Sequence, residues 1–249
     1  MALVQHPNFA AVRMLLHLDG DLTDVAGTPM AADGMAPGGS MAFVAAPAGW
    51  GQQLSVGATH PGGGGSNVVY SAPTAALDLT TTDLTIEARM TIASQQSRPR
   101  YAVYIVDAGT GQLEFSLGAE PASGGAMRWV ATARDSAGTV TVLANNSPTV
   151  AFDVPHHVAL TRSGNDLRLL ADGDLLYATT VAYRAPAGLR ILYAGNAGRA
   201  FVDGLDGCVD EVCITAACLS VAPFEPPEGP YANFWPVSGR AWPGGIHTV

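Results

Sequence analysis

The stretch HVALTRSGNDLRLLADGDLLYATT, residues 157–180, decides the fold class. It holds three runs in which apolar and polar residues alternate, at 157–162, 166–171 and 174–180. Gly164-Asn165 and Asp172-Gly173 separate the runs, and such residues tolerate the positive φ angles of tight hairpin turns. Because alternation with a period of two is typical of strands with one buried face, the stretch predicts a three-stranded antiparallel meander.

The same signal extends over most of the chain. Residues 84–92, LTIEARMTI, alternate apolar with polar side chains and predict another half-buried strand. Further strands are predicted at 12–18, 41–44, 53–56, 101–106, 112–117, 127–133, 139–143, 189–193 and 208–214. The rest of 26–66 is rich in Gly, Ala and Pro and predicts a long loop. Many short strands between turn residues indicate an all-β sandwich or barrel.

Length and composition favour one large β domain. The 249 residues can bury a single core without disulfides. Charged residues make up only 13%, with 29 Gly and 17 Pro, which leaves little room for long amphipathic helices. The net charge is −9, and the 12 basic residues, all Arg, form no cluster. Nucleic-acid binding requires a basic face, so we exclude that class of function.

The first twenty residues, MALVQHPNFAAVRMLLHLDG, lack the basic and apolar regions of a signal peptide. No run reaches the ~18 apolar residues of a membrane span. We therefore expect a protein that is made in the cytoplasm and does not enter a membrane.

Cysteine and histidine patterns indicate no metal centre. Cys208, Cys213 and Cys218 are an odd number at five-residue spacing, which fits neither a disulfide framework nor a zinc motif. We expect buried or idle thiols. His156 and His157 are adjacent on a predicted strand, so their side chains point to opposite faces and do not chelate one ion together.

Four segments carry a family resemblance. They are LLHLDGDLTDVAG (15–27), DLTIEARMTI (83–92), HHVALTRSGNDLRLLADGDL (156–175) and GLDGCVDEVCIT (204–215). In this order they resemble the concanavalin A-like lectin/glucanase superfamily, in its laminin-G-like branch, and in particular the type found in bacteriophage tail and head proteins. The resemblance implies a jelly-roll sandwich of two antiparallel sheets, with the first and last strands side by side. It does not imply one function, because this fold hosts several.

Glycosidase activity is not expected. Glucanases that resemble this chain place paired carboxylates on one face of a strand, where both reach the same sugar. The predicted strands at 84–92 and 112–117 hold one acidic residue each, Glu87 and Glu114. Asp210 and Glu211 are adjacent, so regular alternation predicts that they point to opposite faces. The sequence therefore predicts no enzyme.

A calcium ion is the one cofactor that the resemblance suggests. Relatives hold calcium between the first and last strands with oxygen ligands, and Asp19, the carbonyl of Gly20, and Asp210 lie in the corresponding segments. The alternative is structural: Asp19-Gly20 forms a turn and Asp210 accepts hydrogen bonds from neighbouring backbone. We keep both readings and favour the structural one.

Sugar binding requires exposed aromatic side chains and polar groups. The candidates are Trp50, Tyr70, Trp129, Asn145, Asn146, Tyr183, Tyr193 and Asn196. Trp129 alternates with Met127 and Ala131, which indicates the core instead.

The C-terminal residues 222–249 depart from the sandwich pattern. Proline recurs every few residues and blocks helix and central-strand pairing. The segment nevertheless keeps large aromatic side chains, at Phe224, Tyr231, Phe234, Trp235 and Trp242. The sequence predicts a sandwich over 1–221 and an extended arm over 222–249. The aromatics of the arm are expected to dock on their own sandwich or, as we favour, on a neighbouring subunit.

Two functions remain. The first is a bacteriophage virion structural protein, a head decoration or a tail or fibre component, that binds itself and other virion proteins through its sheets and arm. The second is a carbohydrate-binding module that recognises host-surface glycans.

Overall fold

The computed structural model describes residues 11–18, 20–22, 24–25, 27–33, 41–46, 51–57, 68–77, 79, 83–94, 96–135, 137–181, 188–196 and 205–219. Within these residues the secondary structure is almost entirely β. The strands are β1 (Val12–Leu16), β2 (Met30–Asp33), β3 (Met41–Ala45), β4 (Gln52–Val56), β5 (Val68–Ser71), β6 (Asp83–Ile92), β7 (Arg100–Asp107), β8 (Leu113–Pro121), β9 (Met127–Arg134), β10 (Val140–Thr149), β11 (His156–Ser163), β12 (Asp166–Ala171), β13 (Asp174–Thr180), β14 (Arg190–Ala194) and β15 (Gly207–Thr215).

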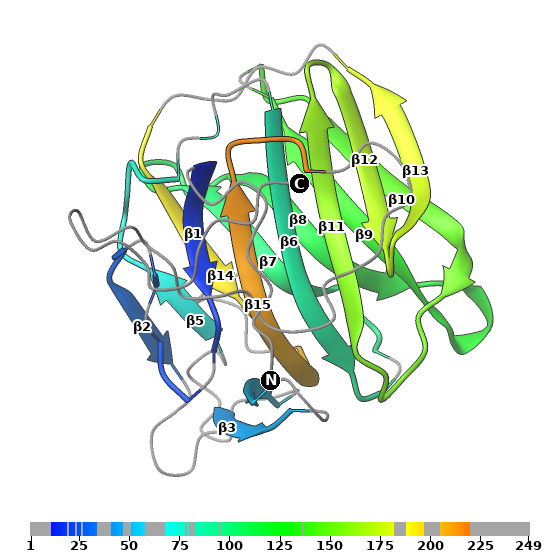
Figure 1. Ribbon diagram of the computed structural model, residues 1–249. Coiled ribbons are helices and arrows are strands. Elements are labelled where there is room, and N and C mark those ends of the chain that lie inside the picture. Colours follow the sequence, from blue (N-terminus) through cyan, green and yellow to red (C-terminus); the bar gives the residue numbers. More distant parts are fainter. Residues whose placement is uncertain are drawn as a thin grey trace, which may run out of the picture.

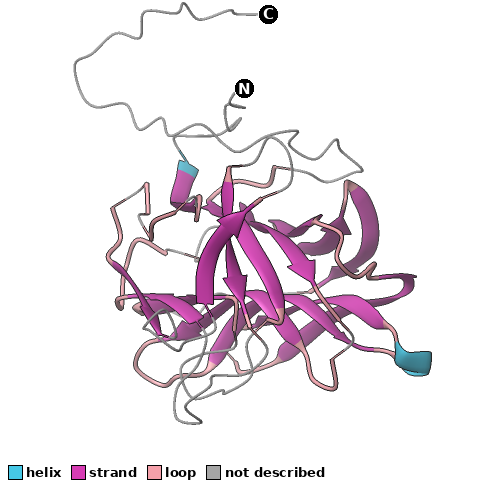
Figure 2. Cartoon of the chain, turned by 90° about the horizontal axis from the view of Figure 1, so that it is seen from below, coloured by secondary structure: helices cyan, strands magenta, loops and turns pink. Residues whose placement is uncertain are grey.

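The strands form two antiparallel sheets packed face to face, as Figures 1 and 2 show. The eight-stranded sheet has the order β13-β12-β11-β6-β15-β4-β3, with β1 also paired to β15. The seven-stranded sheet has the order β10-β9-β8-β7-β14-β5-β2. The predicted all-β jelly-roll sandwich is thus confirmed. Among the described residues no helix has the length and hydropathy needed to cross a bilayer.

Two predicted pairings are confirmed by the strand register. β11, β12 and β13 form the meander, and its turns carry positive φ angles at Gly164 (58°), Asp172 (50°) and Gly173 (87°). The first and last strands lie side by side, with Leu16 opposite Val212. β15 in turn pairs with β6, which places the last strand at the centre of the larger sheet.

The core lies between the sheets and is built by alternation. On β6 the side chains of Leu84, Ile86 and Met90 are buried in it. From the opposite sheet Phe115 and Trp129 fill the same space, and Trp129 is 2% exposed. The predicted core position of Trp129 is therefore confirmed.

The structure corrects the loop predicted over 26–66, and it shows one strand just beyond that range that was not predicted. β2 falls inside the expected loop, and β5 follows it. Each has only four residues, too few for alternation to be seen in a Gly-rich region. Their pairing with each other extends the seven-stranded sheet.

The end of the described chain is tied to the larger sheet. The Thr85 hydroxyl donates a hydrogen bond to the Ala217 carbonyl (2.9 Å) and accepts one from the Leu219 N–H (3.0 Å). Residues 222–249 lie outside the described residues, so the predicted arm stays a prediction.

Candidate binding face

A buried cluster of charged residues lies on the face of the eight-stranded sheet that points away from the core. The Nε2 of His157 is 2.9 Å from Oε2 of Glu87, and Nδ1 of His17 is 2.7 Å from Oε1 of Glu211. Arg89 lies in the field of Asp210 and Glu211; burial lowers the pKa of its guanidinium and these carboxylates oppose that shift. Since Glu87 and Glu211 are 3% and 4% exposed, this cluster is a structural network closed to large ligands.

A β-bulge corrects one prediction about this cluster. The register of β15 against β6 shifts between Asp210 and Cys213, and Glu211 has a φ of 48°. Val209 and Val212 both face the core, so the two residues between them lie together on the other side. The expectation that Asp210 and Glu211 point to opposite faces is wrong, because the extra residue of a bulge interrupts the alternation.

The two adjacent histidines do point apart. His157 faces Glu87, whereas the ring of His156 packs edge-on against Trp129 with centroids 5.1 Å apart. Nδ1 of His156 lies 2.5 Å from Oδ2 of Asp172. Burial lowers the pKa of His156, but the hydrogen bond with Asp172, the charge of that carboxylate and the hydrogen bond with the Ala151 carbonyl together outweigh burial and raise it.

The predicted calcium ligands are only partly described. Asp19 lies outside the described residues, and Gly20 sits against the side chain of Gln52. Asp210 is 2% exposed, accepts a hydrogen bond from the Glu211 N–H (2.9 Å) and stands opposite Arg89 in the register. These partners already satisfy the carboxylate, so the described part of the site fits a calcium ion poorly. No group of three metal-binding side chains occurs elsewhere among the described residues.

None of the three cysteines forms a disulfide. Cys213 is fully buried on β15, and burial raises the pKa of its thiol well above the usual value. Burial also raises the pKa of Cys208. Both thiols are thereby kept protonated and unreactive.

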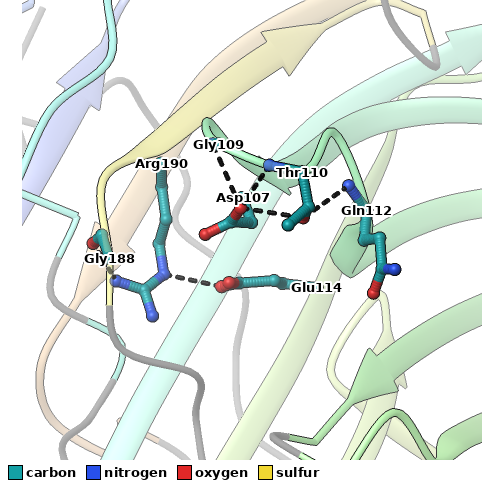
Figure 3. Close-up of polar contacts among 7 residues, drawn as sticks. All are labelled: Asp107, Gly109, Thr110, Gln112, Glu114, Gly188 and Arg190. Atoms are coloured by element: carbon teal, nitrogen blue, oxygen red, sulfur yellow. Dashed lines mark hydrogen bonds and ion pairs between the residues drawn. The ribbon is translucent and has the colours of Figure 1, made fainter.

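A second ion pair holds one end of the seven-stranded sheet together (Figure 3). Nε of Arg190 on β14 lies 2.6 Å from Oε2 of Glu114 on β8, and its Nη1 donates to the Gly188 carbonyl (3.0 Å). Beside it, Oδ1 of Asp107 accepts hydrogen bonds from the N–H groups of Gly109 (3.1 Å) and Thr110 (2.6 Å). The Asp107 hydrogen bonds close the β7–β8 turn, and the Arg190–Glu114 pair joins β14 to β8. We therefore assign this group of residues a structural role.

The outer face of the seven-stranded sheet carries a continuous row of side chains. The strand register aligns Tyr70, Tyr193, Tyr104, Ser116, Thr132 and Val142 across β5, β14, β7, β8, β9 and β10. With ~4.8 Å between neighbouring strands, the row is about 24 Å long. We call its aromatic part, Tyr70, Tyr193 and Tyr104, the tyrosine row.

The tyrosines point away from the core. Their strand neighbours Val69, Leu192 and Val103 belong to the core, whereas all three tyrosine side chains are half-buried. The Tyr70 and Tyr193 rings have centroids 6.3 Å apart and an interplanar angle of 38°. These two rings form an aromatic surface with polar edges, and Tyr104 stands next to Tyr193 in the strand register.

Tyr101 widens this surface. Its ring lies 5.2 Å from that of Tyr104, centroid to centroid. Burial, reinforced by Tyr104 and Glu120, raises the pKa of Tyr101 to about 12. Burial also raises the pKa of Tyr104, against the opposing charge of Arg134. Both phenols are therefore neutral hydrogen-bonding groups over the physiological range.

Polar groups continue the row beyond the tyrosines. The hydroxyls of Ser116 and Thr132 contact each other across β8 and β9. Nη2 of Arg128 lies 2.7 Å from Oε1 of Glu120, and Arg134 extends from the end of β9. We call the tyrosine row together with Tyr101, Thr132 and Arg134 the binding face; Ser116 lies beneath it, 1% exposed.

The sequence identified only part of this face. Tyr70 and Tyr193 were among the candidates, but Tyr101 and Tyr104 were not. The structure places Trp129 in the core and leaves Asn196 4% exposed. The remaining candidates, Trp50, Tyr183 and the side chains of Asn145 and Asn146, lie outside the described residues. The available signal for Tyr104 was its place between Val103 and Ile105 in the predicted strand 101–106, because alternation puts the residue between two apolar core positions on the outer face.

The fold is similar to that of several solved binding domains. The binding domain of Paraclostridial mosquitocidal protein 1 aligns with a TM-score of 0.60 at 10% identity, over 85% of this chain and 50% of that one. The binding domain of botulinum neurotoxin serotype G aligns with a TM-score of 0.59 at 10% identity, over 84% and 48%. The chain thus spans about half the length of these two structures.

A third similar structure matches over nearly its whole length. It is domain 4 of AbnA, a GH43 extracellular arabinanase from Geobacillus stearothermophilus, in complex with arabinotriose. The TM-score is 0.53 at 11% identity, over 84% of this chain and 94% of that domain. At these identities the likeness concerns the fold alone.

Sequence comparison identifies the family. No curated protein matches the chain. A family model described as concanavalin A-like lectin/glucanases superfamily, of the laminin-G type, matches residues 62–222, which include both strands of the central β6–β15 pair and every tyrosine of the binding face. The chain therefore belongs to the concanavalin A-like lectin/glucanase superfamily.

Proposed function

We propose that this chain is a non-catalytic, lectin-like domain that binds an oligosaccharide along the outer face of its seven-stranded sheet. The observation that carries the proposal is the alignment of Tyr70, Tyr193 and Tyr104 on three neighbouring strands. Tyrosine offers a large, rigid contact area with a polar end and loses little conformational entropy on binding.

The chemistry of the face suits a sugar. A pyranose ring has an apolar face of C–H groups, which stacks on an aromatic ring, and a rim of hydroxyls, which needs hydrogen-bond partners. The tyrosine row supplies the first surface, and its phenol groups together with the half-buried Thr132 hydroxyl supply polar partners. A length of about 24 Å accommodates several sugar units.

The solved structures give this proposal independent support. The AbnA domain, which has the same fold over almost its full length, is seen in complex with arabinotriose, and the two toxin structures are binding domains.

The two glutamates of β8 do not form a glycosidase pair, and Asp107, which lies beside Glu114 in Figure 3, is held by the N–H groups of its own turn. Glu114 and Glu120 lie six positions apart on β8, a separation of about 20 Å in an extended strand. Glycosidases need two carboxyl groups within roughly 5–9.5 Å of each other. Glu114 is also bound by Arg190 and Glu120 by Arg128. We therefore propose binding without catalysis.

Replacing Tyr104 tests the tyrosine row. On a glycan array we expect the protein to bind a subset of oligosaccharides, and Tyr104→Ala to weaken that binding about 30-fold or more, as loss of a central aromatic contact does. Tyr177→Ala is the matched control, because Tyr177 is 40% exposed on β13 of the other sheet. Titration calorimetry measures both. Equal affinities of the two variants, or an array without any bound glycan, would contradict the proposal.

The role in a bacteriophage particle stays a prediction, supported by the aromatic arm. Deleting 222–249 should leave the melting temperature nearly unchanged, because the Thr85 contacts to Ala217 and Leu219 remain. It should abolish self-association or incorporation into particles, measured by ultracentrifugation and by mass spectrometry of purified particles. A truncated protein that melts far lower would show that the arm covers its own sandwich instead.

A further inference from the structure

We infer that the binding face selects acidic oligosaccharides, and that Arg134 holds their carboxylate or sulfate beside the ring of Tyr104. The inference rests on the proposed function and names the class of ligand for the same face. Arg134 is two residues after Thr132 on β9, so both side chains lie on the outer side of the sheet. The residues between and around them, Ala131 and Ala133, belong to the core.

The guanidinium of Arg134 forms few hydrogen bonds with other groups of the protein. Its Nη1 makes one long hydrogen bond, 3.4 Å, to the side-chain oxygen of Gln112. Its Nε is buried and has no hydrogen-bond partner. A guanidinium has five N–H donors in a planar fork; the buried Nε is closed to a ligand and one Nη1 donor is engaged by Gln112, so the remaining N–H groups of Nη1 and Nη2 are the ones that a ligand can meet.

The carboxylates nearby are already engaged. Glu120 is bound by Arg128 and Glu114 by Arg190. Asp135, the next residue along the chain, accepts hydrogen bonds from the N–H groups of Ala137 (2.9 Å) and Thr139 (2.8 Å) within its turn. Among the described residues, Arg134 is therefore the cation of this face that forms no ion pair.

The net negative charge of the protein makes binding of an acidic glycan depend on direct contact with Arg134. With a net charge of −9 the protein repels polyanions at long range, so an acidic glycan is not retained by general attraction. Binding then depends on a short-range, charge-assisted contact in which the planar guanidinium meets a carboxylate or sulfate with two parallel hydrogen bonds. Arg134 on β9 and Tyr104 on β7 lie on the same face with only β8 between them, and the charge of Arg134 acts on the Tyr104 phenol, so one sugar can stack on the ring while its acidic group reaches the guanidinium.

The experiment compares three probes on the intact chain by titration calorimetry. They are a galacturonic acid oligosaccharide, its methyl ester, and a sulfated neutral oligosaccharide of equal length. We expect the ester to bind about 10- to 100-fold more weakly than the acid, as loss of one charged hydrogen-bonded contact does. The sulfated probe shows whether the site takes sulfate as well as carboxylate, and binding of either anion above the ester supports the inference.

Arg134→Gln should weaken binding of the acid and of the sulfated probe far more than binding of the ester, so that the preference for the anionic probes is lost. The matched control is Arg168→Gln, which makes the same change in net charge on β12 of the other sheet. Equal affinity of wild-type protein for acid, sulfate and ester would overturn the inference without needing any variant, and would leave the proposed function intact. Absence of binding to all three probes and to the glycan array would overturn both, since the tyrosine row itself would then bind no sugar.

Discussion

Replacing Arg190 by methionine should destabilise the protein by about 3 to 5 kcal/mol, because Glu114 then remains buried without its partner. Both side chains of this ion pair are 2% exposed, and Nε lies 2.6 Å from Oε2. The other oxygen of Glu114, Oε1, has no hydrogen-bond partner. Urea denaturation measures the change as a lower midpoint at an unchanged slope.

The loss should depend on pH. Burial raises the pKa of Glu114 even though Arg190 opposes the shift, so removing Arg190 raises it further. A group whose pKa is higher in the folded state contributes stability below its unfolded pKa, about 4.3, and loses it as the pH rises through the folded value. The deficit of Arg190→Met should therefore be smallest near pH 4 and grow toward neutral pH.

Two further variants test whether the loss of stability arises because the ion pair is buried or would follow from breaking any ion pair. Arg128→Met breaks the pair with Glu120, whose side chains are 30% and 23% exposed, and should cost only about 0.2–1 kcal/mol. The double variant Glu114→Leu/Arg190→Met removes both buried charges and should recover most of the lost stability. A double variant as unstable as the single one would contradict this explanation.

Replacing Trp129 by alanine should cost about 3–5 kcal/mol, since it empties a large volume between the sheets. For a domain of this size that corresponds to a fall in melting temperature of roughly 6–20 °C. The ring is 2% exposed and contacts His156 with centroids 5.1 Å apart. Thermal melts followed by circular dichroism measure the change.

The control for Trp129 is Leu175→Ala on β13, where the side chain is 40% exposed. A surface truncation of this kind should stay within about 0.5 kcal/mol of wild type. If Trp129→Ala instead kept its stability and lost glycan binding, Trp129 would be part of a sugar platform and the assignment of the binding face would be wrong.

Local sequence was sufficient to predict a strand wherever that strand is long and its apolar and polar residues alternate regularly. The run 84–92 became β6 (Asp83–Ile92), and the runs 166–171 and 174–180 became β12 and β13 with the same bounds. Alternation predicted these because one face of each strand meets the core and the other does not. It failed for the four-residue strand β2 and at the bulge after Asp210, where the period of two is too short or is interrupted.

The candidate site depended on information that no local pattern holds. Tyr70, Tyr104 and Tyr193 come from three distant parts of the chain, and only the insertion of β14 between β5 and β7 makes them neighbours. The same holds for Arg190 and Glu114, which are 76 positions apart in sequence. Composition gave the net charge of −9. It did not show that Arg134 is left without an ion pair, because that depends on where each carboxylate lies in the fold.

The sequence by itself determined the class of structure and the inward or outward direction of most side chains, because alternation and turn residues act over a few neighbouring positions. Only the tertiary structure decided which outward side chains stand together. Strand order and register are set by burial of the whole core, so they bring residues together across long sequence separations. The tyrosine row, the buried ion pair and the position of Arg134, whose guanidinium forms no ion pair, are all products of that long-range pairing.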